Sequence, residues 1–326
     1  MLLLTCSVFG LSSCDNDDEV LGVDLTDNGT LFLSSNTSGL VGIIDTKDTP
    51  LELKTFSAAG MDSDGIVYSE RDERIFQVNR STNTVVSYEE VLDDDFAGTV
   101  EFTSTSDFEN GRGMTAAGDN RYIVAQDDDD DSDTDDKDAL VLYSFNDDSG
   151  FTKIKTVKTD FNVWGLEYYE GTLYAISDNT NEVAIINNFF DTPDGGTVTV
   201  DRMISVEGLV RTHGIEYDED DDLMILTDVG SGMVDDDGAL FIIRDFSDFT
   251  GTSVTAANYT KISGANTRLG NPVDVDYDND EEIFYVAERA NGGGVLLTFA
   301  QDANGNATPL NAISFPGLSS LYLNED

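Results

Sequence analysis

Residues 165–178 read GLEYYEGTLYAISD, and this phrase recurs along the chain at intervals of about fifty residues. Each copy has a glycine or aspartate, an alternating apolar run, a short turn that is usually acidic, and a second run that ends in a polar residue. The other complete copies span residues 65–79, 113–127, 214–228 and 274–288, and a divided copy spans 317–323 and 29–36. Repeats of about 40–50 residues built from short strands are typical of β-propellers. The divided copy predicts a ring that closes by pairing the two ends of the chain in one blade.

Two further strand-like segments follow each phrase. The third strands are predicted at residues 39–45, 84–90, 139–145, 182–188, 239–245 and 294–300. The fourth strands are predicted at residues 52–57, 99–104, 152–157, 197–204, 257–263 and 309–314. Six copies with four antiparallel strands each predict an all-β, six-bladed propeller over residues 28–326, with almost no helix because no segment has a 3.6-residue period. A β-sandwich with irregular repeats is the alternative, but it gives no reason for the divided copy.

The closest matches to a known pattern are residues 271–276, NPVDVD, and 173–178, LYAISD. The pattern resembles NHL-repeat propellers and the gluconolactonase/strictosidine-synthase-like six-bladed propellers, and the resemblance covers most of residues 28–326. It implies the architecture well and the function poorly, because propellers host many activities. In the gluconolactonase-like enzymes, several channel positions hold Asn, Asp or Glu around a central divalent cation.

The first fourteen residues, MLLLTCSVFGLSSC, form an apolar run that ends at Leu-Ser-Ser-Cys. This run resembles a bacterial lipoprotein signal, in which residues 1–13 are removed and Cys14 is lipidated. It is too short to span a bilayer as a helix. No lysine or arginine precedes it, which we explain by a start codon assigned too far downstream; a chance match in a short leader is the alternative.

Acidic residues follow Cys14 directly, in the segment DNDDE at 15–19. Such a run resembles the surface-export signal of Bacteroidota lipoproteins, and residues 14–27 are expected to form a flexible acidic tether. We therefore expect an outer-membrane lipoprotein of the cell envelope, exposed at the surface and held by its lipid anchor alone. Cys6, the other cysteine, lies in the leader, so the mature chain is expected to have neither a disulfide nor thiol chemistry.

Negative charge dominates the composition, with 17 Lys and Arg against 65 Asp and Glu and a net charge of −48 at pH 7. Acids lie in almost every predicted turn, for example at 127–131, 218–222 and 278–282. Such a surface repels phosphates, which excludes nucleic acid as a partner, and it repels itself at low salt. Adaptation to salt and a calcium-binding surface are two explanations that stay open. We expect no other cofactor.

The residue before each repeat glycine, or before its counterpart, is expected to face the central channel. These residues are Asp64, Arg112, Trp164, His213, Val273 and Pro316. Only Asp64 suits the oxygen-only shell of a hard cation, so the lactonase metal site is not transferred to this chain and the metal question stays open. An aromatic, an arginine and two titratable groups at one mouth instead predict a binding site for a small polar or anionic ligand, made by Asp64, Arg112, Trp164 and His213. The alternative is that Trp164 plugs the channel and His213 is a hydrogen-bonded rim residue.

Five arginines are assigned to the same face by the loops that carry them: Arg80, Arg112, Arg211, Arg268 and Arg289. Guanidinium groups bind carboxylates and phosphates in bidentate geometry. Pairing with local acids is the alternative, for example Arg289 with Glu288 or Arg112 with Glu109. The acidic loop 126–138 is expected at this face, either as a solvated loop or as a calcium site, and 228–238 is a second insertion there.

These patterns favour a binding module over an enzyme. No nucleophile and base can be paired, so no catalytic residue is assigned. The expected function is that of an exported, lipid-anchored monomer whose propeller binds a small polar or anionic ligand or a protein partner. The alternative is a lactonase- or esterase-like hydrolase at the channel mouth, supported by the fold resemblance together with Asp64, His213 and scattered acids.

Overall fold

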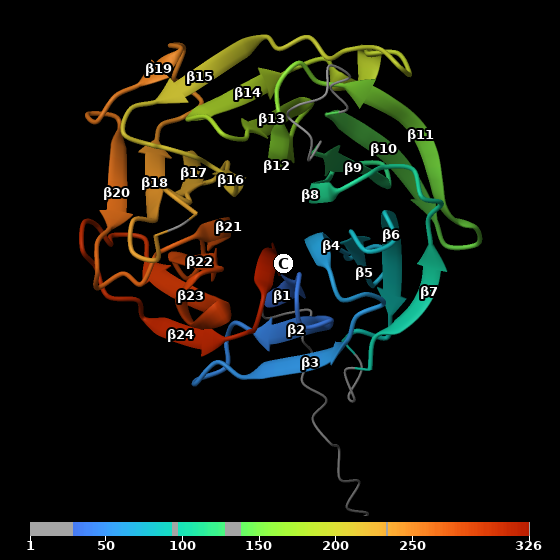
Figure 1. Ribbon diagram of the computed structural model, residues 1–326, viewed down its shortest axis with the longest axis horizontal. Helices are drawn as coiled ribbons and strands as arrows, with labels where there is room; N and C mark the ends of the chain where they lie inside the picture. Colours follow the sequence, from blue (N-terminus) through green and yellow to red (C-terminus); the bar gives the residue numbers. More distant parts are fainter. Residues whose placement is uncertain (1–28, 93–96, 128–137, 233, 326) are drawn as a thin grey trace, which may run out of the picture.

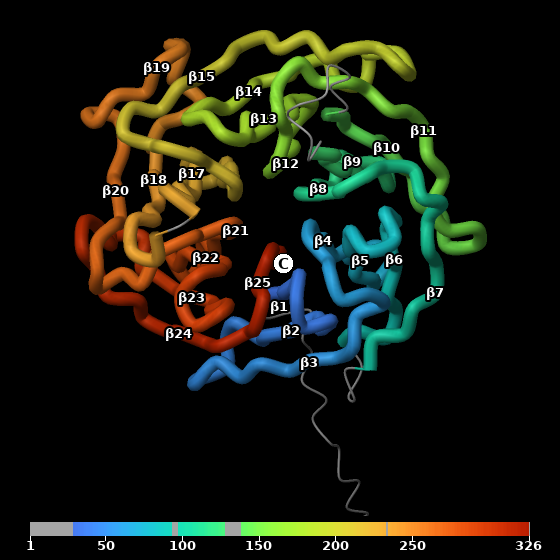
Figure 2. The backbone as a smooth tube through the Cα atoms, viewed as in Figure 1, coloured from blue at the N-terminus to red at the C-terminus, as the bar shows by residue number. Residues whose placement is uncertain are grey.

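The chain folds into a closed ring of β-sheets around a central axis (Figure 1). The structure is a computed structural model that describes residues 29–92, 97–127, 138–232 and 234–325. Each sheet forms one blade, with its first strand near the axis and its last strand at the rim (Figure 2). The predicted all-β, six-bladed propeller is confirmed. Within the described residues, helix is limited to two short 3-10 turns, Phe189–Asp191 and Asn291–Gly293.

The blades are numbered 1 to 6 around the ring, with strands given from axis to rim. Blade 1 contains β25 (Leu318–Asn324), β1 (Thr30–Ser35), β2 (Leu40–Asp45) and β3 (Leu53–Ser57). Blade 2 contains β4 (Ser63–Ser69), β5 (Arg74–Asn79), β6 (Thr84–Glu89) and β7 (Thr99–Thr103). Blade 3 contains β8 (Gly111–Ala116), β9 (Arg121–Gln126), β10 (Ala139–Asn146) and β11 (Gly150–Lys158).

The second half of the ring follows the same plan. Blade 4 contains β12 (Val163–Tyr169), β13 (Thr172–Ser177), β14 (Glu182–Ile186), β15 (Arg202–Val206) and a short β19 (Ser253–Val254). Blade 5 contains β16 (Ile215–Asp218), β17 (Leu223–Asp228), β18 (Ala239–Arg244) and β20 (Tyr259–Ser263). Blade 6 contains β21 (Pro272–Asp278), β22 (Ile283–Glu288), β23 (Val295–Ala300) and β24 (Asn311–Ser314).

Blade 1 closes the ring with strands from the two ends of the described chain. β25 pairs antiparallel with β1, with Leu323 opposite Leu31 and Leu321 opposite Leu33. This pairing confirms that residues 318–323 form the innermost strand of a blade and that β1 lies next to it. Closure removes the two unpaired sheet edges that an open ring would expose.

The hydrophobic core is divided into six clusters, one between each pair of neighbouring blades. The second strand of a blade is buried on both faces because a blade packs on each side of it, and all six residues of β1 are buried. The rim strand β7, in contrast, is mostly exposed. Short apolar runs are sufficient because the sheets pack face to face. Packing around the whole ring therefore sets the positions of the loops at both ends of the channel.

Blade 4 differs from the prediction at its rim. Its fourth strand begins at Arg202 rather than at Thr197, because Thr197 forms an isolated parallel bridge with Lys158 of blade 3. β19 then extends the blade as a short parallel fifth strand, with Ser253 opposite Ser205. Rim strands are exposed on one side and only weakly patterned, so alternation alone does not specify their pairing.

The repeat glycine is required by the close approach of neighbouring inner strands. A Cβ on Gly65 would lie 2.5 Å from the amide nitrogen of Met114, and a Cβ on Gly165 would lie 2.1 Å from the carbonyl oxygen of His213. Such a Cβ at positions 113 and 214 would meet backbone atoms of the next blade at 2.7 and 2.6 Å. Only glycine lets the backbones approach this closely, so these glycines mark where the inner strands touch.

Candidate functional site

A bulge near the start of the inner strands places the residue before the repeat glycine at the channel mouth. The register of β4 on β5 shifts at Asp64 and Gly65. Matching shifts lie at Arg112 in β8 and at Trp164 in β12, and His213 shortly precedes β16. Bulges re-aim side chains and are common beside functional sites. The four predicted site residues thus lie in contact with one another at one end of the channel, the upper mouth.

Trp164, the only tryptophan, lies between side chains from the two blades that flank its own. The guanidinium carbon of Arg112 is 3.9 Å from the Trp164 ring centroid, and the His213 ring stacks on Trp164 at 3.9 Å with an interplanar angle of 5°. Two groups cannot both lie this close over one ring face, so both faces of Trp164 are covered. Trp164 therefore fixes Arg112 and His213 in place and presents its edge, rather than a stacking surface, to a ligand.

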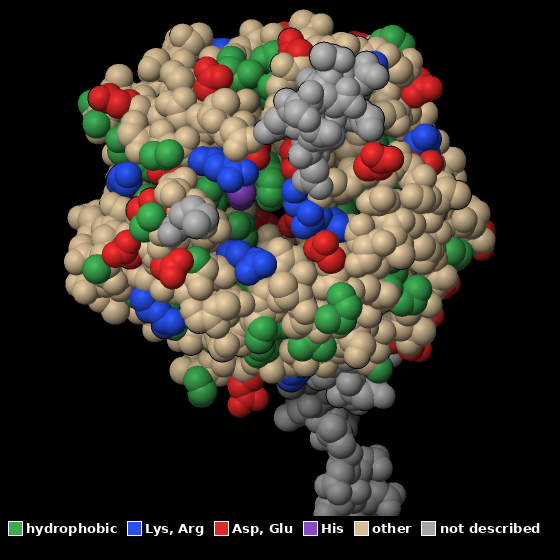
Figure 3. Space-filling model, viewed as in Figure 1, with side chains coloured by type: hydrophobic (Ala, Val, Ile, Leu, Met, Phe, Trp, Pro, Cys, Tyr) green, Lys and Arg blue, Asp and Glu red, His purple; other side chains and the backbone are tan. Residues whose placement is uncertain are grey.

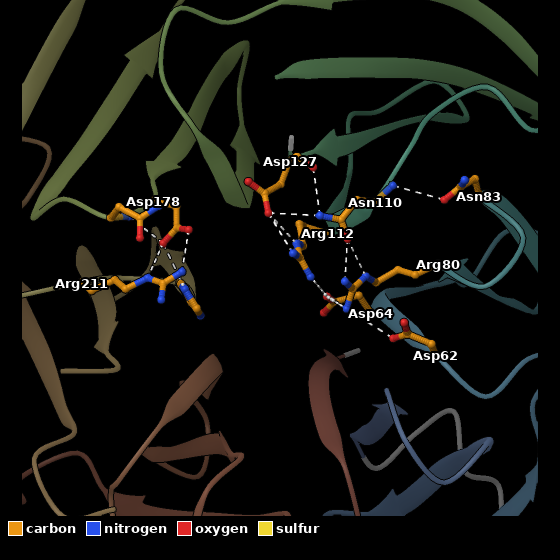
Figure 4. A network of polar contacts seen from close by, with 11 residues as sticks. Asp62, Asp64, Arg80, Asn83, Asn110, Arg112, Asp127, Asp178 and Arg211 are labelled. Carbon is orange, nitrogen blue, oxygen red and sulfur yellow. Dashed lines mark hydrogen bonds and ion pairs between the residues drawn. The ribbon is translucent and has the colours of Figure 1, made fainter. Parts of the chain in front are cut away.

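A buried carboxylate organises one side of the mouth. Asp178 accepts hydrogen bonds from Nε and Nη2 of Arg211, both at 2.7 Å, and its Oδ1 lies 3.1 Å from Nε2 of His213 (Figure 4). Burial acts to raise the pKa of Asp178, but the hydrogen bonds from His213 and Arg211 outweigh it and hold that pKa well below its usual value.

The charged form of His213 is disfavoured despite this carboxylate. Burial lowers the pKa of His213 below its usual value, although Asp178 acts to raise it. With Asp178 ionised, the single ring proton is placed on Nε2, and Nδ1 keeps its lone pair. This Nδ1 is buried and has no hydrogen-bond partner among the described residues.

A larger network occupies the other side of the mouth (Figure 4). Arg112 donates to Oδ2 of Asp127 from Nε at 3.0 Å and from Nη2 at 2.8 Å. Asp64 lies 3.8 Å from Arg112 and 4.0 Å from Arg80, which in turn donates to Asn110 at 2.6 and 3.0 Å. Burial raises the pKa of Asp64 to about 6, although Arg112 and Arg80 act to lower it. Asp64 is therefore mostly ionised at pH 7 and takes up a proton in mildly acidic solution.

The polar residue at the end of each repeat phrase explains where the charged walls lie. In blades 5 and 6 the side chain of this residue binds the backbone. Asp228 accepts hydrogen bonds from three backbone amides, and Glu288 accepts hydrogen bonds from four. In blades 3 and 4 the equivalent Asp127 and Asp178 bind arginine side chains at the mouth. One repeat position thus stabilises loops in one part of the ring and builds a charged wall in another.

A pocket of about 460 Å³ lies at the upper mouth. Its wall includes Asp64, Trp164, His213, Asn36, Asn271, Val273, Arg289 and Ser319. Lys and Arg side chains gather around the hollow at the centre of this face (Figure 3). Oδ1 of Asn36 and Oδ1 of Asn271 are buried and have no hydrogen-bond partner within the part of the chain that the structure describes.

Arg289 differs from three of the other arginines at this face. Arg80, Arg112 and Arg211 each lie within 4.0 Å of a carboxylate. The predicted alternative of an Arg289–Glu288 pair is wrong, because the Glu288 carboxylate accepts backbone amides instead. Among the described residues Arg289 forms no ion pair and lines the pocket.

Two further predicted positions are corrected or refined by the structure. Val273 lines the pocket, as its place in the repeat predicts, but Pro316 is exposed in the turn before β25. The register shift of β25 falls next to Ser319, which takes the position assigned to Pro316. Gly317, read as the sixth repeat glycine, instead serves the preceding turn with a φ of 73°. Arg268 is exposed and is not part of the pocket wall.

The lower mouth, at the opposite end of the channel, is a larger and strongly acidic pocket of about 860 Å³ that sequence reasoning missed. Its wall includes Glu167, Glu216, Asp274 and Asp276, and Arg71 is the only basic residue that lines it within the described chain. Burial raises the pKa of Asp274 to about 7 and raises the pKa values of Glu167, Glu216 and Asp276 well above the usual range.

A signal for these acids was present in the repeat. Glu167, Glu216 and Asp276 each lie two positions after the repeat glycine or its counterpart. Strand side chains alternate between faces, so a residue two positions along the strand faces the same way as the glycine. The acid at this position therefore lines the channel below the glycine ring.

Several predictions fall on residues that the structure does not describe. Cys14, the tether and most of the acidic loop, residues 128–137, lie outside the described ranges. In the remainder, no group of three or more His, Cys, Asp or Glu side chains is arranged to hold a metal ion. The described chain also contains no helix that is long and apolar enough to cross a membrane.

No protein-family model matches the chain, and no curated protein matches its sequence. Solved structures match its fold. A chain of a nidogen/laminin complex is similar with a TM-score of 0.64 and 12% identity, covering 91% of this chain and 98% of that chain. A putative 6-phosphogluconolactonase from Bacteroides fragilis is similar with a TM-score of 0.57 and 12% identity, covering 88% of this chain and 82% of that chain. A functionally unknown protein from Desulfotomaculum acetoxidans is similar with a TM-score of 0.56 and 12% identity, covering 90% of this chain and 84% of that chain. At these identities the similarity shows the fold alone.

Proposed function

We propose that this protein is a binding module whose upper mouth takes up a small polar ligand. The observation that carries the proposal is the pocket of about 460 Å³, whose wall includes Asp64 and His213. Behind these two residues lie the Arg112–Asp127 and Arg211–Asp178 pairs, because Arg112 approaches Asp64 and Asp178 contacts His213. Its volume lies in the range of small-molecule sites, about 300–1,000 Å³. Removing charges from water costs free energy, and groups with perturbed pKa values gather at functional sites. The buried Asp64 and His213 in the wall are suited to recognising polar groups.

A matched pair of substitutions tests whether the pocket is the binding site. Val273→Phe places a larger side chain in the pocket wall, whereas Val210→Phe enlarges a 63% exposed residue that is not part of that wall. Polar compounds that raise the melting temperature of the wild type should do so in Val210→Phe and not in Val273→Phe. Compounds that stabilise both variants equally would place binding elsewhere. The melting temperature without compound shows whether each variant is folded.

Hydrolysis is a second candidate, favoured by the Asp178–His213 contact. A neutral imidazole that is held by a buried carboxylate, with its other nitrogen unpaired, can accept a proton from water as that water attacks an ester carbonyl. Hydrolysis of p-nitrophenyl acetate should then fall in Asp178→Asn and not in Asp119→Asn, which changes an exposed surface residue. Equal rates in wild type and His213→Gln would exclude this candidate.

We also propose that lipid on Cys14 holds the module at the cell envelope, on the basis of the Leu-Ser-Ser-Cys pattern and the acidic segment after it. Cys14→Ala should move the protein from the membrane fraction to the soluble fraction. Cys6→Ala, in the same leader, is the matched control and should leave the distribution unchanged. Retention of Cys14→Ala in the membrane fraction would contradict lipidation.

A further inference from the structure

We infer that the ligand of the upper mouth is a hydroxylated anion, a small molecule with one carboxylate or phosphate group and at least two hydroxyl groups. This inference rests on the proposed binding function and adds the chemical class of the ligand. It is carried by two features of the pocket wall: an arginine that forms no ion pair with a described residue, and several buried hydrogen-bond acceptors that have no donor among those residues.

The cation is Arg289. It lies in the loop between β22 and β23 and lines the pocket, and it makes no ion pair with any described residue. Its guanidinium carries five N–H donors in a fork that matches a carboxylate or a phosphate. Arg289 is the one arginine among the described residues of the pocket wall, and it can bind an anion without breaking an ion pair. Arg112 and Arg211 lie outside the wall and are bound to Asp127 and Asp178.

The acceptors are Nδ1 of His213, Oδ1 of Asn36 and Oδ1 of Asn271. All three atoms are buried, belong to residues of the pocket wall and have no hydrogen-bond partner among the described residues. His213 is 6% exposed, and its Nδ1 must accept because Nε2 carries the proton for Asp178. Buried acceptors without a donor are costly and rare in folded proteins, so we assign their donors to the ligand.

Hydroxyl groups meet this requirement better than an ammonium group. A hydroxyl donates one hydrogen bond and accepts others, and it carries no charge into a mouth that already holds several guanidinium groups. The centre of the Trp164 ring, beside His213, lies 3.9 Å from the Arg112 guanidinium carbon and 5.8 Å from that of Arg211. A neutral hydroxyl next to Nδ1 leaves the ion pairs of both arginines undisturbed.

Four probes separate the charge of the ligand from its hydroxyl groups. D-glucuronate carries both, D-glucose has hydroxyls without charge, and cyclohexanecarboxylate has the charge on a six-membered ring without hydroxyls. D-glucose 6-phosphate distinguishes a phosphate from a carboxylate as the source of the anion. Because Trp164 is the only tryptophan, its fluorescence reports on this mouth alone, and calorimetry gives an independent affinity.

At least one of the two hydroxylated anions should bind tenfold or more tightly than both glucose and cyclohexanecarboxylate. Arg289→Gln should weaken that binding at least tenfold without lowering the melting temperature. Arg268→Gln is the matched control, since this arginine is exposed on the same face and outside the pocket wall, and it should bind like the wild type.

Each remaining outcome overturns the inference. Glucose binding as tightly as the anions, with binding lost in Val273→Phe, would keep the pocket as a ligand site and refute its preference for anions. Cyclohexanecarboxylate binding as tightly as glucuronate would refute the role of the hydroxyl groups. Failure of both anions to bind at millimolar concentrations would also refute it, and failure of every polar compound to bind would refute the proposed function as well.

Discussion

The two mouths of the channel hold carboxylates from different positions of the repeat and treat them in opposite ways: those of the upper mouth follow second strands, and those of the lower mouth lie on inner strands. At the upper mouth Asp127 and Asp178 are paired with arginines, and the pKa of Asp178 is held low. At the lower mouth Glu167, Glu216 and Asp276 share one pocket with few cations, and burial raises their pKa values. The repeat decides where a side chain lies, and its neighbours in the same and the adjacent blade decide whether it keeps its charge.

The largest expected effect comes from removing the strand that lines both mouths. Truncation after Gly317 deletes β25, which carries Ser319 at the upper mouth and donates the backbone amide of Leu323 to Asp276 at the lower one. Its buried Leu318 and Leu321 each contribute about 1.5–3 kcal/mol, against a net stability of about 5–15 kcal/mol for a typical domain. Circular dichroism should show loss of cooperative unfolding.

Removal of residues 325–326 alone is the control for that truncation and should leave most of the stability intact. A truncated protein that melts at the wild-type temperature would show that ring closure does not support either mouth.

Removing a carboxylate from the upper mouth should destabilise the protein. Asp178→Ala leaves Arg211 and His213 without their shared anion, and breaking a buried pair costs about 3–5 kcal/mol. Because Arg211 is partly exposed, we expect about 2 kcal/mol in urea unfolding at pH 7. Asp119→Ala, which breaks an exposed pair with Arg121, should cost less than about 1 kcal/mol. Equal losses in both variants would mean that burial at the upper mouth adds nothing to the strength of the pair.

Removing a carboxylate from the lower mouth should have the opposite sign. A carboxyl whose pKa is raised on folding holds a proton that the unfolded chain has released, so stability falls as pH rises above about 4.5. Glu167→Gln or Glu216→Gln should therefore raise stability at pH 8 by more than about 1.4 kcal/mol, the value of one pKa unit, because the pKa of Glu167 is raised to about 8 and that of Glu216 well above its usual value. The gain should vanish at pH 4. Glu52→Gln, at an exposed position, should change little.

The free energy of unfolding of these variants, measured by denaturant at pH 4, 6 and 8, tests this expectation. A loss of stability in Glu167→Gln at pH 8 would mean that the carboxylate is bound by a cation there rather than protonated.

The smallest expected effect is that of salt. The net charge of −48 is spread over exposed turns, and the Debye length falls from about 8 Å at physiological ionic strength to about 3 Å at 1 M. The melting temperature should rise by about 2–4 °C over this range, which corresponds to about 1 kcal/mol. A Glu167→Gln/Glu216→Gln double variant should show the same rise, because protonated channel carboxyls have no charge to screen. A rise confined to the wild type would assign the salt effect to the lower mouth.

Much of the architecture is determined by sequence alone, because it depends on local pattern. The repeated glycine marks where neighbouring inner strands touch, alternation specifies the buried faces, and the divided repeat specifies closure. The same repeat position brought Asp64, Arg112, Trp164 and His213 together, although about 150 residues separate the first from the last.

Only the tertiary structure decided what those side chains do. The burial of both faces of Trp164, the pairing of Asp178 with Arg211 and His213, and the absence of an ion pair at Arg289 within the described ranges all depend on distances between blades. Ser319, and not the predicted Pro316, lines the pocket because of one register shift in β25. Hydrogen bonds and ion pairs act over a few ångströms between residues far apart in the chain, so the repeat specifies the positions and the closed ring selects the partners.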